Sequence, residues 1–516
     1  MDVAIVIAYF VAVFLMGIYK RVSTETTMSE YFMHSNSLRW PSIALSTIAT
    51  NIHSGHFLGM TGSAYLFGLA QANFEVNALQ GILFAAFIFV PIYLKERILT
   101  IGQFFERILG PKVAVSYSLF LILMNAFVFV GSVLFWGGYA VNAVFPEAIA
   151  FISPDPMIRI FVVAIALGLF SATYTYLGGM GAVVRTDIIQ FVLLLVGGLF
   201  LTFMCINAIG GWGVLWDERS DVMHLHLPAN HPTLPWPAIA GMMLINFYYW
   251  GSNQVIVQRA LAAKNLHHAQ VGLIAGGFLK YFMALIIIVP GIALSILMEA
   301  NPLTDPDLAY PTLILQFIPT GLRGIILCGL FASLMSSVDS LFHSTSTLFS
   351  IDIYKRHLRP NASDQQVVKV GRYFIWAMFL AGVIFAWVNV YVKFDNPGFA
   401  LTHWFNEMTF YVQNGIAFLI IVAIFLVAPS KRLVLWTLIG SVLCTFFMKI
   451  GFPEMNYLNR TSIVILTTVL VVATHTIIKQ GRPKNWGQLI KISSPGVGWL
   501  GLVLLISLLA SHVVFH

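Results

Sequence analysis

Four serines lie on one face of a predicted helix inside the apolar segment 321–352. They are Ser333, Ser336, Ser337 and Ser340. Their spacing of i, i+3, i+4 and i+7 places all four hydroxyls on the same side. Hydroxyl and backbone oxygens are hard ligands, so this face, joined by carbonyls of unwound backbone at Ala49 and Ile52, would suit Na⁺. The structural alternative is that the serines allow close packing or bond to their own backbone.

Two acids lie near or inside the apolar segments, where a carboxylate is costly and points to a function. They are Asp187 and Asp339. We predict that they face one another with Ser336 and Ser340 between them. Because like charges at short range raise one pKa strongly, such a pair would hold a second cation or share a proton. Alternatively, Asp187 pairs with Arg185 or is solvated, and Asp339 pairs with a cytoplasmic Lys or Arg or with water.

A second polar group mixes hydrogen-bond donors with acceptors inside apolar segments. Its members are His56, Glu75, Asn246, Lys280 and Gln413. Lys280 lies roughly 18 Å into its helix at about 1.5 Å per residue, so it needs a partner or water. Such a mixture suits a neutral polyhydroxylated solute, because every hydroxyl must be paired again after leaving water. For any one of these residues, a structural hydrogen bond is the alternative.

Three aromatic residues accompany this polar group. Phe74, Tyr249 and Trp250 could form flat apolar walls against a sugar ring. No metal-ligand spacing and no nucleophile–base motif occurs in the sequence, which argues against a membrane enzyme.

Two apolar segments are interrupted by polar residues and glycine, which a lipid-facing helix avoids. The interruptions cover residues 48–56 and 246–253. Paired interrupted helices in two halves of a chain mark the midplane site of an inverted-repeat transporter. The alternative is a pair of glycine-containing contacts in a helix bundle.

The composition excludes a water-soluble body. Of 516 residues, 59% are hydrophobic and 9% are charged, and the mean hydropathy is +0.85. Because a soluble domain carries about 25% charged residues, a soluble enzyme, a nucleic-acid binder and a disordered scaffold are excluded. We expect the lipid bilayer to surround the chain.

The apolar segments predict an all-α polytopic membrane protein with a single transmembrane domain over residues 1–516. About fourteen segments are candidates for membrane spans. They are 2–19, 41–66, 74–94, 113–144, 157–178, 187–210, 236–258, 268–298, 321–352, 368–391, 405–428, 433–450, 461–478 and 497–515.

The distribution of Lys and Arg predicts the orientation. Of 28 such residues, 21 fall on one side of this topology, six on the other, and Lys280 lies within a span. Basic loops are cytoplasmic, so we expect a multi-pass protein of the cell membrane with both termini on the extracytoplasmic side. The cytoplasmic set includes Lys20, Arg21, Arg259, Arg482 and Lys484.

Several short stretches of the sequence resemble the sodium/solute symporter family, and within it the sodium/glucose cotransporters. The resemblance covers about residues 1–480. Its specific stretches are residues 51–57 (NIHSGHF), 74–79 (FEVNAL), 186–190 (TDIIQ), 246–251 (NFYYWG), 336–337 with 344–349 (STSTLF), and 411–413 (YVQ). It implies a LeuT-type fold of five-plus-five inverted repeats with extra helices. The first repeat would cover about 41–210 and the second about 236–428, followed by additional helices over 433–515.

Site residues follow from the resemblance at the matching positions. A sodium site is implied at Ala49, Ile52, Ser333, Ser336 and Ser337. Gates are implied at Tyr249 on the inner side and at Met60 and Phe74 on the outer side. Sugar contacts are implied at Asn51, His56, Glu75, Asn246, Trp250, Lys280 and Gln413.

Three positions depart from the family pattern. Ser333 stands where many members have Ala, and Ala78 lacks a hydroxyl that some sugar-binding members carry. Asp339 stands where members with a second sodium site have Ser or Thr, grouped with the aspartate at 187. The possible second cation site therefore comprises Asp187, Asp339 and Ser340.

The sequence thus favours a sodium-coupled symporter that imports a hexose-like sugar or a polyol by alternating access. Na⁺ is the co-transported ion rather than a prosthetic group. One alternative is a symporter for another organic solute, such as sialic acid or an amino acid. A second is a sugar-gated sensor or leak channel on the same scaffold.

Overall fold

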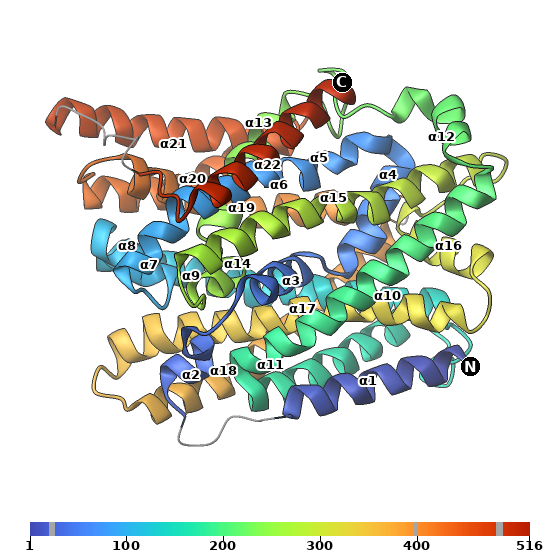
Figure 1. Cartoon of the computed structure of the whole chain (residues 1–516), viewed down its shortest axis with the longest axis horizontal. Coiled ribbons are helices and arrows are strands. Elements are labelled where there is room, and N and C mark those ends of the chain that lie inside the picture. Colours follow the sequence, from blue (N-terminus) through green and yellow to red (C-terminus); the bar gives the residue numbers. More distant parts are fainter. Residues whose placement is uncertain (20–25, 397, 399–400, 481–488) are drawn as a thin grey trace.

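The computed structural model of the chain is a bundle of helices, most of which run along one common direction (Figure 1). It describes all residues except 20–25, 397, 399–400 and 481–488. Four of the predicted cytoplasmic basic residues therefore lie outside the described part. They are Lys20, Arg21, Arg482 and Lys484.

The helices follow the chain in this order. The first half contains α1 (Asp2–Ile18), α2 (Met28–Met33), α3 (Trp40–Asn51), α4 (Thr61–Phe67), α5 (Asn73–Val76), α6 (Ala78–Phe84), α7 (Val90–Glu96), α8 (Ile101–Leu109), α9 (Pro111–Leu123), α10 (Val130–Val144), α11 (Pro156–Ile209) and α12 (Trp212–Arg219). The second half contains α13 (Ala238–Gly251), α14 (Gln254–Leu261), α15 (Leu266–Leu297), α16 (Ala309–Phe317), α17 (Leu322–Leu348), α18 (Asp364–Asp395), α19 (Leu401–Phe425), α20 (Lys431–Gly451), α21 (Tyr457–Gln480) and α22 (Pro495–Val514).

Within the described residues, ten helical stretches are long and apolar enough to cross a membrane. The number is smaller than fourteen partly because α1 is a shorter apolar helix and the 54-residue α11 joins two predicted spans. Inside α11 the chain turns at Gly179, whose φ of 58° favours glycine. The all-helical membrane architecture is thus confirmed, and the count of fourteen stays a prediction.

Both predicted interruptions are breaks between helices. The first break follows α3, where Ile52 is extended (φ −93°, ψ 110°) before a π-helical turn at His56–Met60 leads into α4. The second separates α13 from α14 at Asn253 (φ −74°, ψ 109°), whose side chain accepts a hydrogen bond from the amide of Val255. An Asn at this position satisfies one of the free amides at the start of α14.

The polar α17 lies in the interior of the bundle. In its most apolar 18-residue stretch, 94% of the residues are buried, against 22% in both α20 and α22. Serine hydroxyls and a carboxylate are tolerated at membrane depth when neighbouring helices shield them from lipid. The helix with the serine face therefore occupies the protein core, while α20 and α22 lie at the exposed periphery of the bundle.

Candidate substrate and sodium sites

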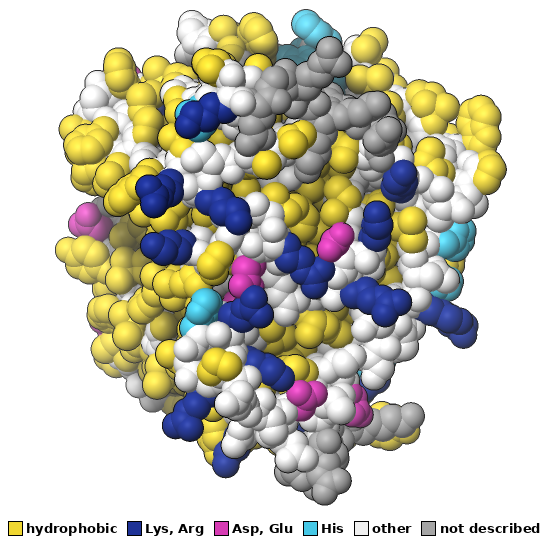
Figure 2. Space-filling view, turned by 90° about the vertical axis from the view of Figure 1, so that its left-hand side faces the viewer, with side chains coloured by type: hydrophobic (Ala, Val, Ile, Leu, Met, Phe, Trp, Pro, Cys, Tyr) yellow, Lys and Arg dark blue, Asp and Glu magenta, His cyan; other side chains and the backbone are white. Residues whose placement is uncertain are grey.

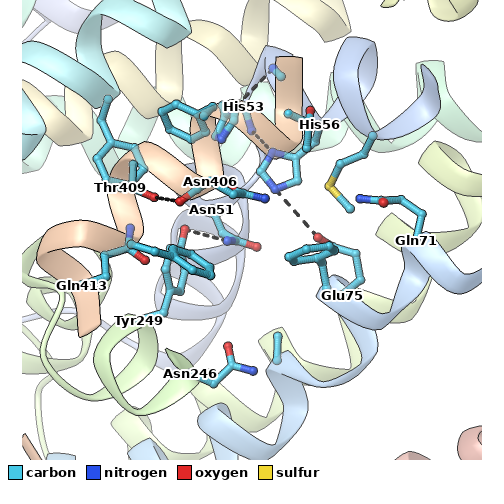
Figure 3. Close-up of a pocket in the computed structure, with 18 of the residues that line it drawn as sticks. Asn51, His53, His56, Gln71, Glu75, Asn246, Tyr249, Asn406, Thr409 and Gln413 are labelled. Atoms are coloured by element: carbon cyan, nitrogen blue, oxygen red, sulfur yellow. Dashed lines mark hydrogen bonds and ion pairs between the residues drawn. The ribbon is translucent and has the colours of Figure 1, made fainter. Parts of the chain in front are cut away.

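A central cavity of about 130 Å³ lies between the two broken helices and is lined by parts of α19 (Figure 3). All ten residues predicted as sugar contacts or gates line it. They are Asn51, His56, Met60, Phe74, Glu75, Asn246, Tyr249, Trp250, Lys280 and Gln413. Residues more than 350 positions apart in the sequence thus meet at one site, and their roles in binding stay predictions.

A buried ion pair crosses the cavity wall. Lys280 Nζ lies 2.5 Å from Glu75 Oε2 and donates a 2.5 Å hydrogen bond to Asn51 Oδ1. Both charged side chains are only 2% exposed. Asn51 in turn donates to the hydroxyl of Tyr249 at 2.8 Å. The partner that Lys280 needs inside the membrane is therefore Glu75, and the pair carries no net charge.

The remaining polar contacts surround this pair. His56 Nε2 lies 3.8 Å from Glu75 Oε1, and His56 Nδ1 accepts the backbone amide of His53 at 3.2 Å. Asn246 donates to the backbone carbonyl of Asn77 at 2.9 Å, which leaves its own amide oxygen for a ligand. The indole N–H of Trp250 is buried and has no hydrogen-bond partner among the described residues.

Tyr249 lines both the central cavity and a smaller one. A second cavity of about 20 Å³ is lined by Tyr249 together with Thr50, Asn253 and Ser337. His53 and Phe129 also line both cavities, and the role of Tyr249 as a gate stays a prediction. Met60 and Phe74 line only the central cavity.

Several further cavity residues were not predicted from the sequence. They are His53, Gly55, Gln71, Phe129, Trp136, Thr402, Phe405, Asn406, Thr409 and Phe410, besides Ala78, which was noted only as a departure. For Gln71 a signal existed, because it lies one helical turn before Glu75 and shares its face. Phe129 and Trp136 come from α9–α10, a continuous apolar segment with no sequence signal.

The predicted sodium ligands lie where α3 meets α17. Ser337 donates to the backbone carbonyl of Thr50 at 3.1 Å, so the serine face does reach the broken end of α3. The carbonyls of Ala49 and Ile52 belong to the end of this helix, where carbonyls lack an intrahelical partner. Ser333 instead donates to Leu330 of its own helix at 2.7 Å, the structural alternative for that residue.

Asp187 is held by a buried arginine that the sequence placed in a cytoplasmic loop. Arg259 lies inside α14, and its Nη2 is 3.5 Å from Asp187 Oδ2, with both side chains 0% exposed. Ser46 and Ser336 each donate to the carboxylate at 2.5 Å. Ser340 accepts a hydrogen bond from Arg259 and lies 2.9 Å from the hydroxyl of Thr50.

Asp339 has a different set of partners. Ser171 and Tyr174 donate to its two carboxylate oxygens, and Thr175 lies 3.4 Å from one of them. These donors belong to the first half of α11, whereas Asp187 belongs to the second half. Among the described residues, the two carboxylates share no hydrogen-bond donor, and their facing arrangement with Ser336 and Ser340 between them stays a prediction.

Comparison with known proteins decides the family. The profile that describes the sodium:solute symporter family matches residues 31–440. The chain belongs to this family. Sodium/myo-inositol cotransporter 2 of Mus musculus is 29% identical over 526 residues, covering 92% of this chain and 76% of that protein. Sodium/glucose cotransporter 1 of Ovis aries is 32% identical over 479 residues, covering 85% and 70%.

The fold is also shared with a solved structure of the same kind of transporter. A Na⁺-coupled sialic acid symporter, solved in a substrate-bound outward-open state, superposes with a TM-score of 0.79. The match covers 94% of this chain and 98% of the symporter chain, and the two sequences are 20% identical. The LeuT-type fold and the resemblance to sodium-coupled sugar cotransporters are thus confirmed. Members of this family are multi-pass membrane transporters rather than enzymes, with Na⁺ as the co-transported ion.

Proposed function

We propose that this protein is a sodium-coupled symporter that imports a neutral sugar or polyol by alternating access. The observation that carries the proposal is the cavity in which Glu75, Lys280, Asn51 and their aromatic neighbours converge. Its donors and acceptors match a solute rich in hydroxyl groups, and Tyr249 and Trp250 supply the flat walls. The similar proteins named above are cotransporters of glucose and myo-inositol.

The charge of the cavity argues for a neutral solute. Glu75 and Lys280 neutralise one another at 2.5 Å, so neither charge is free for a carboxylate or an ammonium group of the substrate. Sialic acid and amino acids both carry a carboxylate. The similarity to the sialic acid symporter, at 20% identity, concerns the fold.

Within this proposal the site residues take the roles expected from the sequence. The sugar or polyol would contact Asn51, His56, Glu75, Asn246, Trp250, Lys280 and Gln413. Tyr249 would close the cavity on the inner side, and Met60 and Phe74 on the outer side. The inverted repeats would cover about 41–210 and 236–428, each with its broken helix first.

The experiment that tests the proposal is uptake into proteoliposomes. A panel of radiolabelled sugars and polyols is offered with an inward Na⁺ gradient and with the gradient collapsed. We expect accumulation of one or more neutral hexoses or polyols only with the gradient. Downhill flux without accumulation would favour a leak channel, and binding without flux would favour a sensor.

Ser337→Ala is expected to raise the Na⁺ concentration needed for half-maximal uptake by about tenfold. The change removes one hydroxyl ligand from a site formed with the carbonyls of Ala49 and Ile52 and with Ser336. A tenfold loss of Na⁺ affinity corresponds to about 1.4 kcal/mol of binding free energy. Uptake against Na⁺ concentration measures the effect. Ser333→Ala is the matched control, because its hydroxyl bonds to Leu330 of its own helix, whereas that of Ser337 reaches the Thr50 carbonyl of α3. An unchanged Na⁺ requirement in Ser337→Ala would place the sodium site elsewhere.

Asp339→Ala is expected to lower the Hill coefficient for Na⁺ from above one toward one, if Asp187, Asp339 and Ser340 take part in a second cation site. Because Arg259 already pairs with Asp187, this site requires Asp339 to exchange its donors on α11 for an ion during transport. If a proton binds instead, the variant changes the pH dependence of uptake. A variant with neither change would show that Asp339 has only a structural role.

The orientation is also a proposal, with both termini outside the cytoplasm of a cell-membrane protein. Figure 1 places the N-terminus at the right-hand end of the bundle and the C-terminus at the top, right of the centre, where the amide of Leu225 bonds to the Phe515 carbonyl. Figure 2, which views the opposite, left-hand end, has many Lys and Arg side chains on its surface. A basic face is typical of the cytoplasmic side, and the termini lie away from it. Cysteine labelling of His516→Cys, at an exposed position, from either side of the membrane tests this orientation.

A further inference from the structure

Gln71 is a fully buried side chain of the central cavity that has no partner for its amide. Its side chain is 0% exposed and lines the cavity. Neither Oε1 nor Nε2 has a hydrogen-bond partner among the described residues. Figure 3 shows the amide directed into the cavity, on the same side as His56 and Glu75. A buried amide without partners is unfavourable, so it requires an explanation.

The backbone that carries Gln71 is fixed. Gln71 belongs to the tight turn Gly68–Ala72 between α4 and α5. Asn73 donates to the carbonyls of Ala70 at 3.1 Å and Leu225 at 2.6 Å, which ties this turn to an outer loop. A methyl group on Gly68, whose φ is +65°, would come within 2.3 Å of the Val222 carbonyl of the same loop. These contacts hold the backbone of Gln71 at the wall of the cavity.

The polar residues around Gln71 alternate between two faces. Asn73 and Asn77 are four residues apart and bond to one another at 2.9 Å, away from the cavity. Gln71 and Glu75 are also four residues apart and share the face toward the cavity. Glu75 is paired with Lys280. Of these four side chains, Gln71 is the one in which neither polar atom has a partner among the described residues, so a solute in the cavity can bind to both atoms.

We propose that Gln71 forms an outer subsite that binds hydroxyl groups of the solute one helical turn away from Glu75. This inference rests on the proposed function. A carboxamide offers one acceptor and two donors and carries no charge, so two adjacent hydroxyls satisfy it, one donating to Oε1 and one accepting from Nε2. The substrate class is therefore a hexose or cyclic polyol with free hydroxyls at the end near Met60 and Phe74. A solute with an alkyl group at that end would leave the amide unpaired.

A cycle of protein and ligand changes tests the subsite. Na⁺-driven uptake of radiolabelled D-glucose and myo-inositol is measured in proteoliposomes for the wild type and Gln71→Leu. The monodeoxy analogues of D-glucose are then tested as competitors of both proteins. In the wild type, we expect loss of one particular hydroxyl to weaken competition about tenfold, as for a lost buried hydrogen bond. In Gln71→Leu, the same analogue should compete as well as D-glucose.

Gln80→Leu is the matched control. Gln80 lies on α6, also has a buried side-chain oxygen without a partner, and does not line the cavity. Its profile of analogues should equal that of the wild type. Because the amide of Gln71 holds no described residue in place, Gln71→Leu should retain the size-exclusion profile and melting temperature of the wild type.

The outcomes separate this inference from the proposed function. Na⁺-driven uptake with the same analogue profile in the wild type and Gln71→Leu would overturn the subsite and leave the symporter intact; an amide that bonds only to water gives that result. Absence of Na⁺-driven uptake of every sugar and polyol would overturn the proposed function itself. If Gln71→Leu does not fold, equal competition by all deoxy analogues in the wild type still overturns the subsite.

Discussion

Glu75→Ala is expected to abolish measurable Na⁺-driven sugar uptake. The change leaves the ammonium of Lys280 buried without its partner at 2.5 Å. Removing one member of a buried ion pair destabilises the structure that holds the pair by about 3–5 kcal/mol. This free energy corresponds to more than a hundredfold in the equilibrium constant for forming that structure. The variant also loses a hydrogen-bond acceptor at the centre of the cavity. Sugar affinity and initial uptake rates at saturating Na⁺ measure the effect.

A double variant separates the loss of the pair from the loss of binding. Glu75→Gln combined with Lys280→Met removes both charges, so the fold should recover while sugar affinity stays low. Melting temperature reports the fold, and equilibrium binding of radiolabelled sugar reports the site. Wild-type affinity in Glu75→Ala would move the substrate site away from this pair.

Asp187→Ala is expected to destabilise the folded protein by about 3–5 kcal/mol. Arg259 would then be a fully buried guanidinium whose hydrogen-bond partners are hydroxyl and carbonyl oxygens. Its removal together with Asp187, in the variant Asp187→Ala with Arg259→Met, should cost less than either single change, because no unpaired charge remains. Thermal unfolding in detergent measures this coupling. Additive losses would show that the two residues do not stabilise one another.

The lining of the central cavity was predictable in part because it includes polar and charged residues that stand inside apolar segments. A Lys at position 280 or a Glu at position 75 inside an apolar segment requires a partner, and the partner is in each case the other residue. The interruptions near Ile52 and Asn253 were visible for the same reason, since glycine and polar side chains replace the expected apolar run. Isolated polar residues in apolar segments thus predict side chains that line one cavity.

The sequence does not predict the partners of Asp187 and Asp339, because those partners are distant in the chain and their local sequence is ordinary. Arg259 follows an apolar segment and was assigned to a basic loop, yet it lies inside α14 against Asp187, 72 positions earlier. Asp339 bonds to Ser171 and Tyr174, whose hydroxyls are unremarkable in an apolar helix. Which carboxylate meets which donor depends on how α11, α14 and α17 pack, and hydropathy does not encode that packing.

The most direct test of the symport mechanism is the charge carried with the solute. Proteoliposomes are held at zero membrane potential and equal Na⁺ on both sides, and a neutral sugar or polyol accepted in the uptake panel is added outside. The account predicts a sugar-evoked inward current that requires Na⁺ and disappears in Glu75→Ala. Because one charge moving across 100 mV corresponds to about 2.3 kcal/mol, the same proteoliposomes should accumulate the sugar when the interior is made negative. Sugar flux with no current and no response to the potential would contradict electrogenic coupling of sodium to the solute.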